Sequence, residues 1–174
     1  MPFLVAAVVL IGLVAAVNLL LTLGVIRRLN EPSSDPHPGT ARPGGPGTEL
    51  PPGSRAEMFT ARTIDGEQVS DADVRGLVGF FSAHCEPCHT LAPLFADKAR
   101  TMARGEVLAV VAGADADLIA TLAPVARVVT EDFDGAVQAA FHNTWTPAVY
   151  LLGDDRRVVA GGGRMSDLPS EARA

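Results

Sequence analysis

Hydrophobic and polar positions divide the chain into three parts, the first of which is entirely apolar in character. From residue 3 to residue 26 no side chain is charged, and only Asn18 and Thr22 are polar. A helix of this length spans ~36 Å, which is enough to cross a hydrocarbon core of ~30 Å. A buried core helix would show a polar stripe, and a cleaved signal peptide would begin with basic residues and end at a small-residue cleavage site. The pattern predicts one retained transmembrane anchor over 3–26.

A polar segment rich in proline and glycine follows and is predicted to be a linker over 27–56. Within it, 30–53 holds seven of the 13 prolines and five of the 17 glycines, and Leu50 is its only large aliphatic residue. Such a composition cannot bury enough apolar surface to fold, and its prolines favour an extended tether.

The remaining residues, 57–174, alternate between strand and helix patterns. Apolar runs typical of buried strands cover 77–81, 106–111, 126–130 and 148–152, and helical spacing covers 86–102, 115–122 and 134–142. Residues 58–69 alternate in character around a turn at Asp65 and Gly66, and a turn at 153–155 leads to a last strand over 157–160. Strands alternating with helices indicate an α/β domain with a central mixed sheet flanked by helices and an N-terminal hairpin.

Charge and composition narrow the classes of function. The chain carries 14 Lys and Arg against 20 Asp and Glu, a net charge of −6. This argues against nucleic-acid binding, which needs clustered basic side chains. The charges of 27–49 cancel, so the whole negative balance belongs to residues 50–174. Two cysteines cannot staple a disulfide-rich miniprotein.

Those two cysteines, Cys85 and Cys88, stand three positions apart where a predicted strand meets a predicted helix. At the start of a helix, free N–H groups and the helix dipole favour a thiolate over a thiol. A spacing of one helical turn brings the two sulfurs within disulfide reach. The pair therefore predicts thiol–disulfide exchange without a bound cofactor or metal. Cys85 would be the nucleophile, and Cys88 would resolve the mixed disulfide.

Other interpretations of the pair stay open. Metal binding usually needs a second cysteine pair or histidine ligands. Residues 85–89 read CEPCH, which matches the attachment motif of c-type haem. Two inert buried cysteines are the structural alternative. A peroxidase motif is matched only in part, because Ser82 fits it but Val78 stands where its proline is required.

The stretch GFFSAHCEPCHTLAP resembles the active site of the thioredoxin superfamily, and FHNTWTPAVYLLGDDRRVVAGGG resembles its cis-proline loop, final hairpin and glycine cluster. The resemblance covers roughly 58–164 and implies a thioredoxin-like fold. It also implies a cis bond between Thr146 and Pro147 that faces the disulfide and presents the Thr146 backbone to an extended substrate. The segment FTARTIDGEQVSDADVRG is similar to the extra hairpin of membrane-anchored TlpA-like and ResA-like proteins, an AhpC/TSA-related group. Related anchored thioredoxins accompany methylamine dehydrogenase maturation.

The chain departs from the family pattern around its cysteines. His84 stands where many relatives have tryptophan, and no residue clearly matches the buried carboxylate that accepts the proton of the inner cysteine. His84, Glu86 and Pro87 are candidate modulators of the couple. A carboxylate at Glu86 disfavours the thiolate and so favours a reductase, whereas a protonated His84 acts in the opposite direction. Trp145 is predicted to line a substrate groove, with a place in the core as the alternative.

Together these observations predict a membrane-tethered thiol–disulfide oxidoreductase that reduces protein disulfides. Its partners would be a cysteine-containing protein substrate, a redox partner protein and, through the N-terminal helix, the membrane. The alternative is a non-catalytic maturation or assembly factor with the same fold. A single-pass location in the cell membrane is expected, with the redox domain outside the cytoplasm. Arg27 and Arg28, directly after the anchor, favour the opposite orientation by the positive-inside rule.

Overall fold

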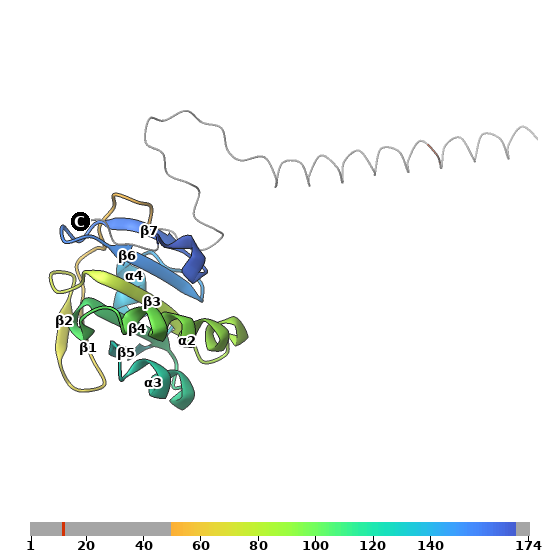
Figure 1. Cartoon of the computed structure of the whole chain (residues 1–174), viewed down its shortest axis with the longest axis horizontal. Coiled ribbons are helices and arrows are strands. Elements are labelled where there is room, and N and C mark those ends of the chain that lie inside the picture. Colours follow the sequence, from red (N-terminus) through yellow and green to blue (C-terminus); the bar gives the residue numbers. More distant parts are fainter. Residues whose placement is uncertain (1–11, 13–49, 170–174) are drawn as a thin grey trace, which may run out of the picture. The chain divides into compact units, whose positions relative to one another are not determined.

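The computed structural model of the chain describes residue 12 and residues 50–169 (Figure 1). The predicted anchor over 3–26, apart from Gly12, and the predicted linker up to residue 49 lie outside the described residues. Among the residues that are described, no helix combines the length and the apolar composition that crossing a membrane requires.

The last residues assigned to the linker are part of the folded unit. Leu50 is buried against the core. The Gly53 N–H donates to Val158 O at 2.7 Å, and the Val158 N–H donates to Ser54 O at 2.8 Å. The unit therefore begins at least seven residues before the predicted boundary at 57, because this segment pairs with a strand far away in the sequence.

A mixed β-sheet forms the centre of the unit, with helices on both of its faces (Figure 1). Within residues 50–169 its strands are β3 (Gly76–Ser82), β4 (Val107–Ala112), β5 (Arg127–Glu131), β6 (Ala148–Leu152) and β7 (Val158–Gly162), in the order β5-β4-β3-β6-β7. The helices are α2 (Glu86–Ala99), α3 (Ala116–Leu122) and α4 (Ala136–Ala140), with short 3₁₀ turns η1 (Arg104–Glu106) and η2 (Met165–Asp167). β3, β4 and β5 are parallel, whereas β6 and β7 run antiparallel to their neighbours. The predicted α/β architecture is confirmed.

The predicted N-terminal hairpin is also present. β1 (Thr60–Arg62) and β2 (Gln68–Ser70) pair antiparallel as a separate two-stranded sheet. Gly66 closes the turn between them with a φ of 84°, a conformation that favours glycine, and its N–H donates to Thr63 O. An isolated bridge from Thr63 to Val129 attaches the hairpin to β5 at the edge of the main sheet.

Side chains alternate between the two faces of the sheet, so each inner strand contributes to two separate cores. On β3, Leu77 and Phe81 belong to the core under α2 and α3. Val78 and Phe80 belong to the core under α4 and the hairpin. This double burial explains why the strands appear in the sequence as continuous apolar runs rather than as alternating ones.

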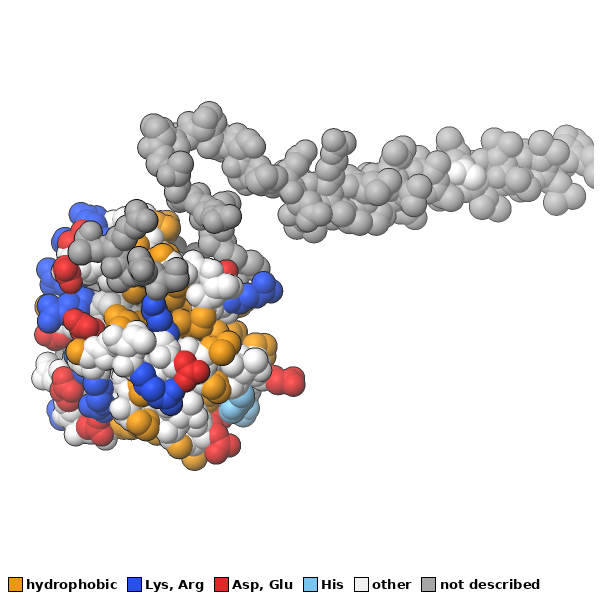
Figure 2. All heavy atoms as spheres, in the orientation of Figure 1, with side chains coloured by type: hydrophobic (Ala, Val, Ile, Leu, Met, Phe, Trp, Pro, Cys, Tyr) orange, Lys and Arg blue, Asp and Glu red, His pale blue; other side chains and the backbone are white. Residues whose placement is uncertain are grey.

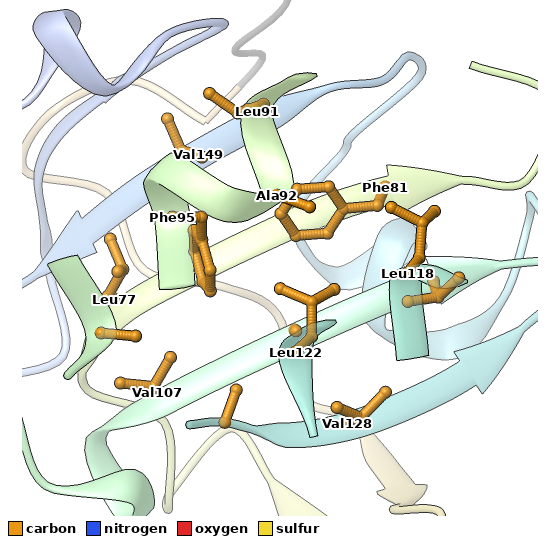
Figure 3. Packing of buried hydrophobic residues seen from close by; sticks show 14 of the residues in the cluster. Leu77, Phe81, Leu91, Ala92, Phe95, Val107, Leu118, Leu122, Val128 and Val149 are labelled. Atoms are coloured by element: carbon orange, nitrogen blue, oxygen red, sulfur yellow. The ribbon is translucent and has the colours of Figure 1, made fainter. Parts of the chain in front are cut away.

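Figure 3 shows the first core, in which two helices pack onto one face of the sheet. Its labelled members are Leu91, Ala92 and Phe95 from α2, Leu118 and Leu122 from α3, and Leu77, Phe81, Val107, Val128 and Val149 from the strands. The rings of Phe81 and Phe95 meet edge to face, with centroids 5.3 Å apart. Gly79 lies under this pair, and a Cβ there would come within 2.6 Å of the Phe95 ring and 2.7 Å of the Phe81 ring.

The ends of two helices differ from the prediction. The helix predicted over 86–102 ends at Ala99, and the N–H of Thr101 then bonds to Lys98 O, three residues back rather than four. This tightening ends the α-helix, although Met102 still packs against the core and so continues the apolar spacing. The helix predicted over 134–142 is reduced to α4, because Gly135 is its N-cap and His142 adopts a positive φ of 50°.

Gly79→Ala tests the packing of the first core. We expect the added methyl group to lower the free energy of unfolding by about 1–3 kcal/mol, because two rings would have to leave their present positions. Urea denaturation followed by circular dichroism measures the effect. Gly105→Ala is the matched control, since a Cβ there meets nothing within 4 Å. Equal stability of the two variants would contradict this account of the core.

Candidate functional site

The two cysteines lie at the junction of β3 and α2 and form a disulfide, with their Cα atoms 5.2 Å apart. Cys85 is the N-cap of α2, and its N–H donates to Ser82 O at the end of β3. The Cys88 N–H donates to Cys85 Sγ at 3.2 Å, so the sulfur satisfies one of the free donors of the first turn. Pro87 occupies this turn without cost, because a helix makes no bond to the N–H there.

The two sulfurs differ in their access to solvent. Cys85 is partly exposed, whereas Cys88 is 0% exposed and belongs to the core with Leu91 and Phe95. Only Cys85 can therefore be reached by a large partner, and Cys88 can be reached only by Cys85.

The loop before β6 carries Trp145, Thr146 and Pro147, and the bond between Thr146 and Pro147 is cis. Pro147 is buried, while Trp145 and Thr146 are half-buried. The side chain of Asn143 is hydrogen-bonded to this loop, because its Nδ2 donates to Trp145 O at 2.8 Å. The Tyr150 hydroxyl donates to Asn143 Oδ1 at 3.4 Å, and Asn143 itself is 4% exposed.

A groove of about 910 Å³ runs from the first turn of α2 to the cis-proline loop and η2. Its lining is mostly apolar and includes three charged side chains. The side chains and backbone that form it belong to Glu86, Pro87, Thr90, Leu91, Leu94, Trp145, Thr146, Pro147, Gly163, Arg164, Met165, Ser166 and Asp167. Glu86 and Pro87, between the two cysteines, thus line the same groove as the cis-proline loop.

Two acidic side chains and two histidines lie near the disulfide. Glu86 and His84 are exposed on either side of Cys85, and His89 Nε2 lies 3.4 Å from Asp115 Oδ2 at the start of α3. At the end of β5, Glu131 accepts the N–H groups of the first turn of α4, and burial nevertheless raises the pKa of its carboxyl group above the usual value. Within the described residues, no three His, Cys, Asp or Glu side chains come together as a metal ion would need.

Comparison with known proteins identifies the fold. No protein-family model matches the sequence, and no curated protein is significantly similar to it. The thioredoxin domain of a thiol-disulfide oxidoreductase from Bacteroides vulgatus is 23% identical, with a TM-score of 0.56 over 69% of this chain and 94% of that one. The chain has a thioredoxin fold.

Two further solved structures share it. A thiol:disulfide interchange protein from Bacteroides sp. is 21% identical, with a TM-score of 0.52 over 64% of this chain and 81% of that one. A thio-disulfide isomerase from Thermus thermophilus is 19% identical, with a TM-score of 0.50 over 64% and 85%. At these identities the similarity establishes the thioredoxin fold and leaves the activity to be argued from the site.

Some residues of the site could not be recognised in the sequence. Helical spacing places Leu94 inward with Leu91 and Phe95, yet Leu94 is 53% exposed and lines the groove. Asn143 carries no signal of its own, because its role depends on contacts with Trp145 and Tyr150 in the thioredoxin fold. Met165 and its neighbours in η2 follow the last strand. They line the groove because the order of the strands places the end of β7 beside it. The roles of the predicted site residues in exchange stay predictions.

Asn143→Ala tests the support of the cis-proline loop. We expect the free energy of unfolding to fall by about 1–3 kcal/mol, because the change leaves buried polar groups without their partner. Of the two Asn143 bonds, Tyr150→Phe removes the longer and keeps the one to Trp145 O, so it should cost less. Urea denaturation of both variants checks this order, and a larger loss in Tyr150→Phe would contradict it.

Proposed function

We propose that the chain is a thiol–disulfide oxidoreductase that reduces protein disulfides through Cys85 and Cys88. One observation carries this proposal: a disulfide at a helix N-terminus has one accessible sulfur, one buried sulfur and a large groove beside it. Solved structures of thiol-disulfide oxidoreductases with the same fold support it. A purely structural disulfide would need neither the groove nor the difference in access.

Exchange would proceed in two steps. The Cys85 thiolate attacks one sulfur of a substrate disulfide, forms a mixed disulfide and releases the other substrate sulfur as a thiolate. Cys88 loses its proton and attacks Cys85 Sγ, which forms the internal disulfide and releases the second substrate sulfur. Two electrons pass from the chain to the substrate, and the released thiolates take up two protons. A dithiol of a redox partner protein then returns the chain to its reduced form by the reverse sequence.

The surroundings of the cysteines favour the reductive direction. The exposed carboxylate of Glu86 follows Cys85 directly, and negative charge near a thiolate destabilises it. Cys88 lies in an apolar core, where an anion is poorly solvated. Both effects disfavour a thiolate in the reduced pair, and a couple whose reduced form lacks thiolate stabilisation is a better reductant. The N-terminus of α2 acts in the opposite direction at Cys85.

The apolar segment 3–26 supports the proposal that this domain is tethered to the cell membrane. A domain on a tether of 23 residues (27–49) stays near the membrane surface, where its local concentration toward membrane-bound partners is high. The proposed redox chemistry also favours a location outside the cytoplasm, since disulfides persist in oxidising compartments.

A redox titration of the full chain, purified in detergent, tests both the couple and its direction. Thiols are counted by alkylation and mass after equilibration with dithiol buffers of defined potential. We expect one two-electron transition with a midpoint near the ~−270 mV of thioredoxin. A midpoint near the ~−120 mV of DsbA would show an oxidant instead, and the absence of a reversible transition would overturn the oxidoreductase proposal.

Single cysteine variants test the order of the two steps. Cys88→Ser should accumulate a mixed disulfide between Cys85 and a peptide disulfide, because the resolving thiol is gone. Cys85→Ser is the matched control and should accumulate none, since Cys88 is fully buried. Mass spectrometry of the trapped species identifies the cysteine involved, and trapping at Cys88 would contradict the proposed roles.

A further inference from the structure

Charge is distributed unevenly between the two ends of the sheet. The segments that follow β3, β4, β5 and β7 lie at the same edge as the disulfide, because these four strands share one direction. We call these four segments (83–89, 113–117, 131–135 and 163–167) the disulfide edge, meaning the end of the sheet at which the four strands finish and not an outer strand. They hold seven carboxylates, one arginine and no lysine. The rest of residues 50–169 holds nine acidic and nine basic side chains, so the net charge of the described unit resides at this edge.

Ion pairs do not offset this imbalance. Among the described residues, arginines form ion pairs with Asp65, Glu67, Asp97 and Asp155, none of which belongs to the disulfide edge. At the edge, the side chain of Asp115 faces His89, and the carboxylate of Asp167 accepts the backbone N–H of Arg164. Figure 2 shows blue and red side chains interspersed at the left of the domain, whereas red side chains and a histidine stand together at its lower right.

The groove beside the disulfide opens at this acidic edge. Leu94, Trp145 and Met165 give it an apolar floor, and Leu94 is 53% exposed although it is a large hydrophobic residue. Glu86, Asp167 and the lone arginine of the edge, Arg164, also line it. An apolar floor at an edge that holds seven carboxylates and one arginine is complementary to a chain segment that carries an apolar side chain between basic ones.

We propose that this groove binds an extended segment of a protein substrate in which an apolar side chain adjoins the reacting cysteine and Lys or Arg residues flank it. The inference rests on the proposed function and names its substrate class. The apolar side chain occupies the floor at Leu94 and Trp145, and the basic residues face the carboxylates of the edge. The field of these carboxylates raises the rate of encounter with a basic substrate and lowers it with an acidic one.

Two matched peptides test the proposal. Each has one internal disulfide and a leucine beside the reacting cysteine, flanked by lysines in one peptide and by glutamates in the other. The reduced full chain, in detergent, is mixed with each peptide in a stopped-flow instrument, and the second-order rate constant of exchange is measured. At ~0.01 M salt the lysine peptide should react at least about tenfold faster. At ~1 M salt, where the Debye length is ~3 Å, the difference should largely disappear.

Two triple variants distinguish the edge from net charge in general. Asp117→Asn, Asp132→Asn and Asp134→Asn neutralise exposed carboxylates of the disulfide edge. Asp71→Asn, Asp97→Asn and Asp154→Asn change the net charge equally at other positions. The first variant should lower the preference for the lysine peptide at least about threefold, and the second should leave it nearly unchanged. An equal loss in both variants, or equal rates of the two peptides with the native chain, would overturn the proposal.

Two more measurements complete the test. Leu94→Gln should slow the lysine peptide at ~1 M salt by about threefold or more, because the apolar floor is then the remaining source of affinity. An unchanged rate would overturn the assignment of the floor. The small uncharged disulfide of 2-hydroxyethanethiol should react equally with the native chain and both triple variants. A native chain that reacts with neither this compound nor the peptides would instead refute the proposed function.

Discussion

The burial of Cys88 against the sheet is the contact on which the rest of the site depends. Because its sulfur belongs to the same core as Leu91 and Phe95, the first turn of α2 cannot rise from the sheet without opening that core. The N-cap position is thereby held at the surface, and Cys85 stays accessible while bonded to a buried partner. The hydrophobic effect that buries Cys88 thus fixes the position in which Cys85 would take part in thiol–disulfide exchange.

The strands and the cysteine motif could be predicted from the sequence because their signals are local. A strand buried on both faces is a continuous apolar run wherever it occurs, and a cysteine pair at one helical turn has the same reach in any chain. The ends of the helices were less predictable. Met102 keeps the apolar spacing beyond the true end of α2, and His142 ends α4 through a backbone conformation that periodicity does not record.

The groove and its support depend on contacts between distant parts of the chain, which no local pattern contains. Leu94 has the spacing of a core residue, and only the position of η2 beside it shows that this face of α2 borders a groove. Asn143 is one of many polar residues until the fold places it under the Trp145 carbonyl. The disulfide edge likewise consists of four segments that are far apart in the sequence. The strand directions are needed to show that their carboxylates lie at the same end of the sheet.

The short segment before the hairpin covers part of the outer strand of the sheet. β7 is an outer strand of the sheet, and unpaired outer strands are templates for pairing with other chains. Gly53 and Ser54 occupy the backbone groups of Val158 at the start of this strand, while Leu50 covers apolar surface nearby. A fragment that begins at residue 57 would expose both features. The residues that lead into the domain therefore also cover part of the outer edge of its sheet.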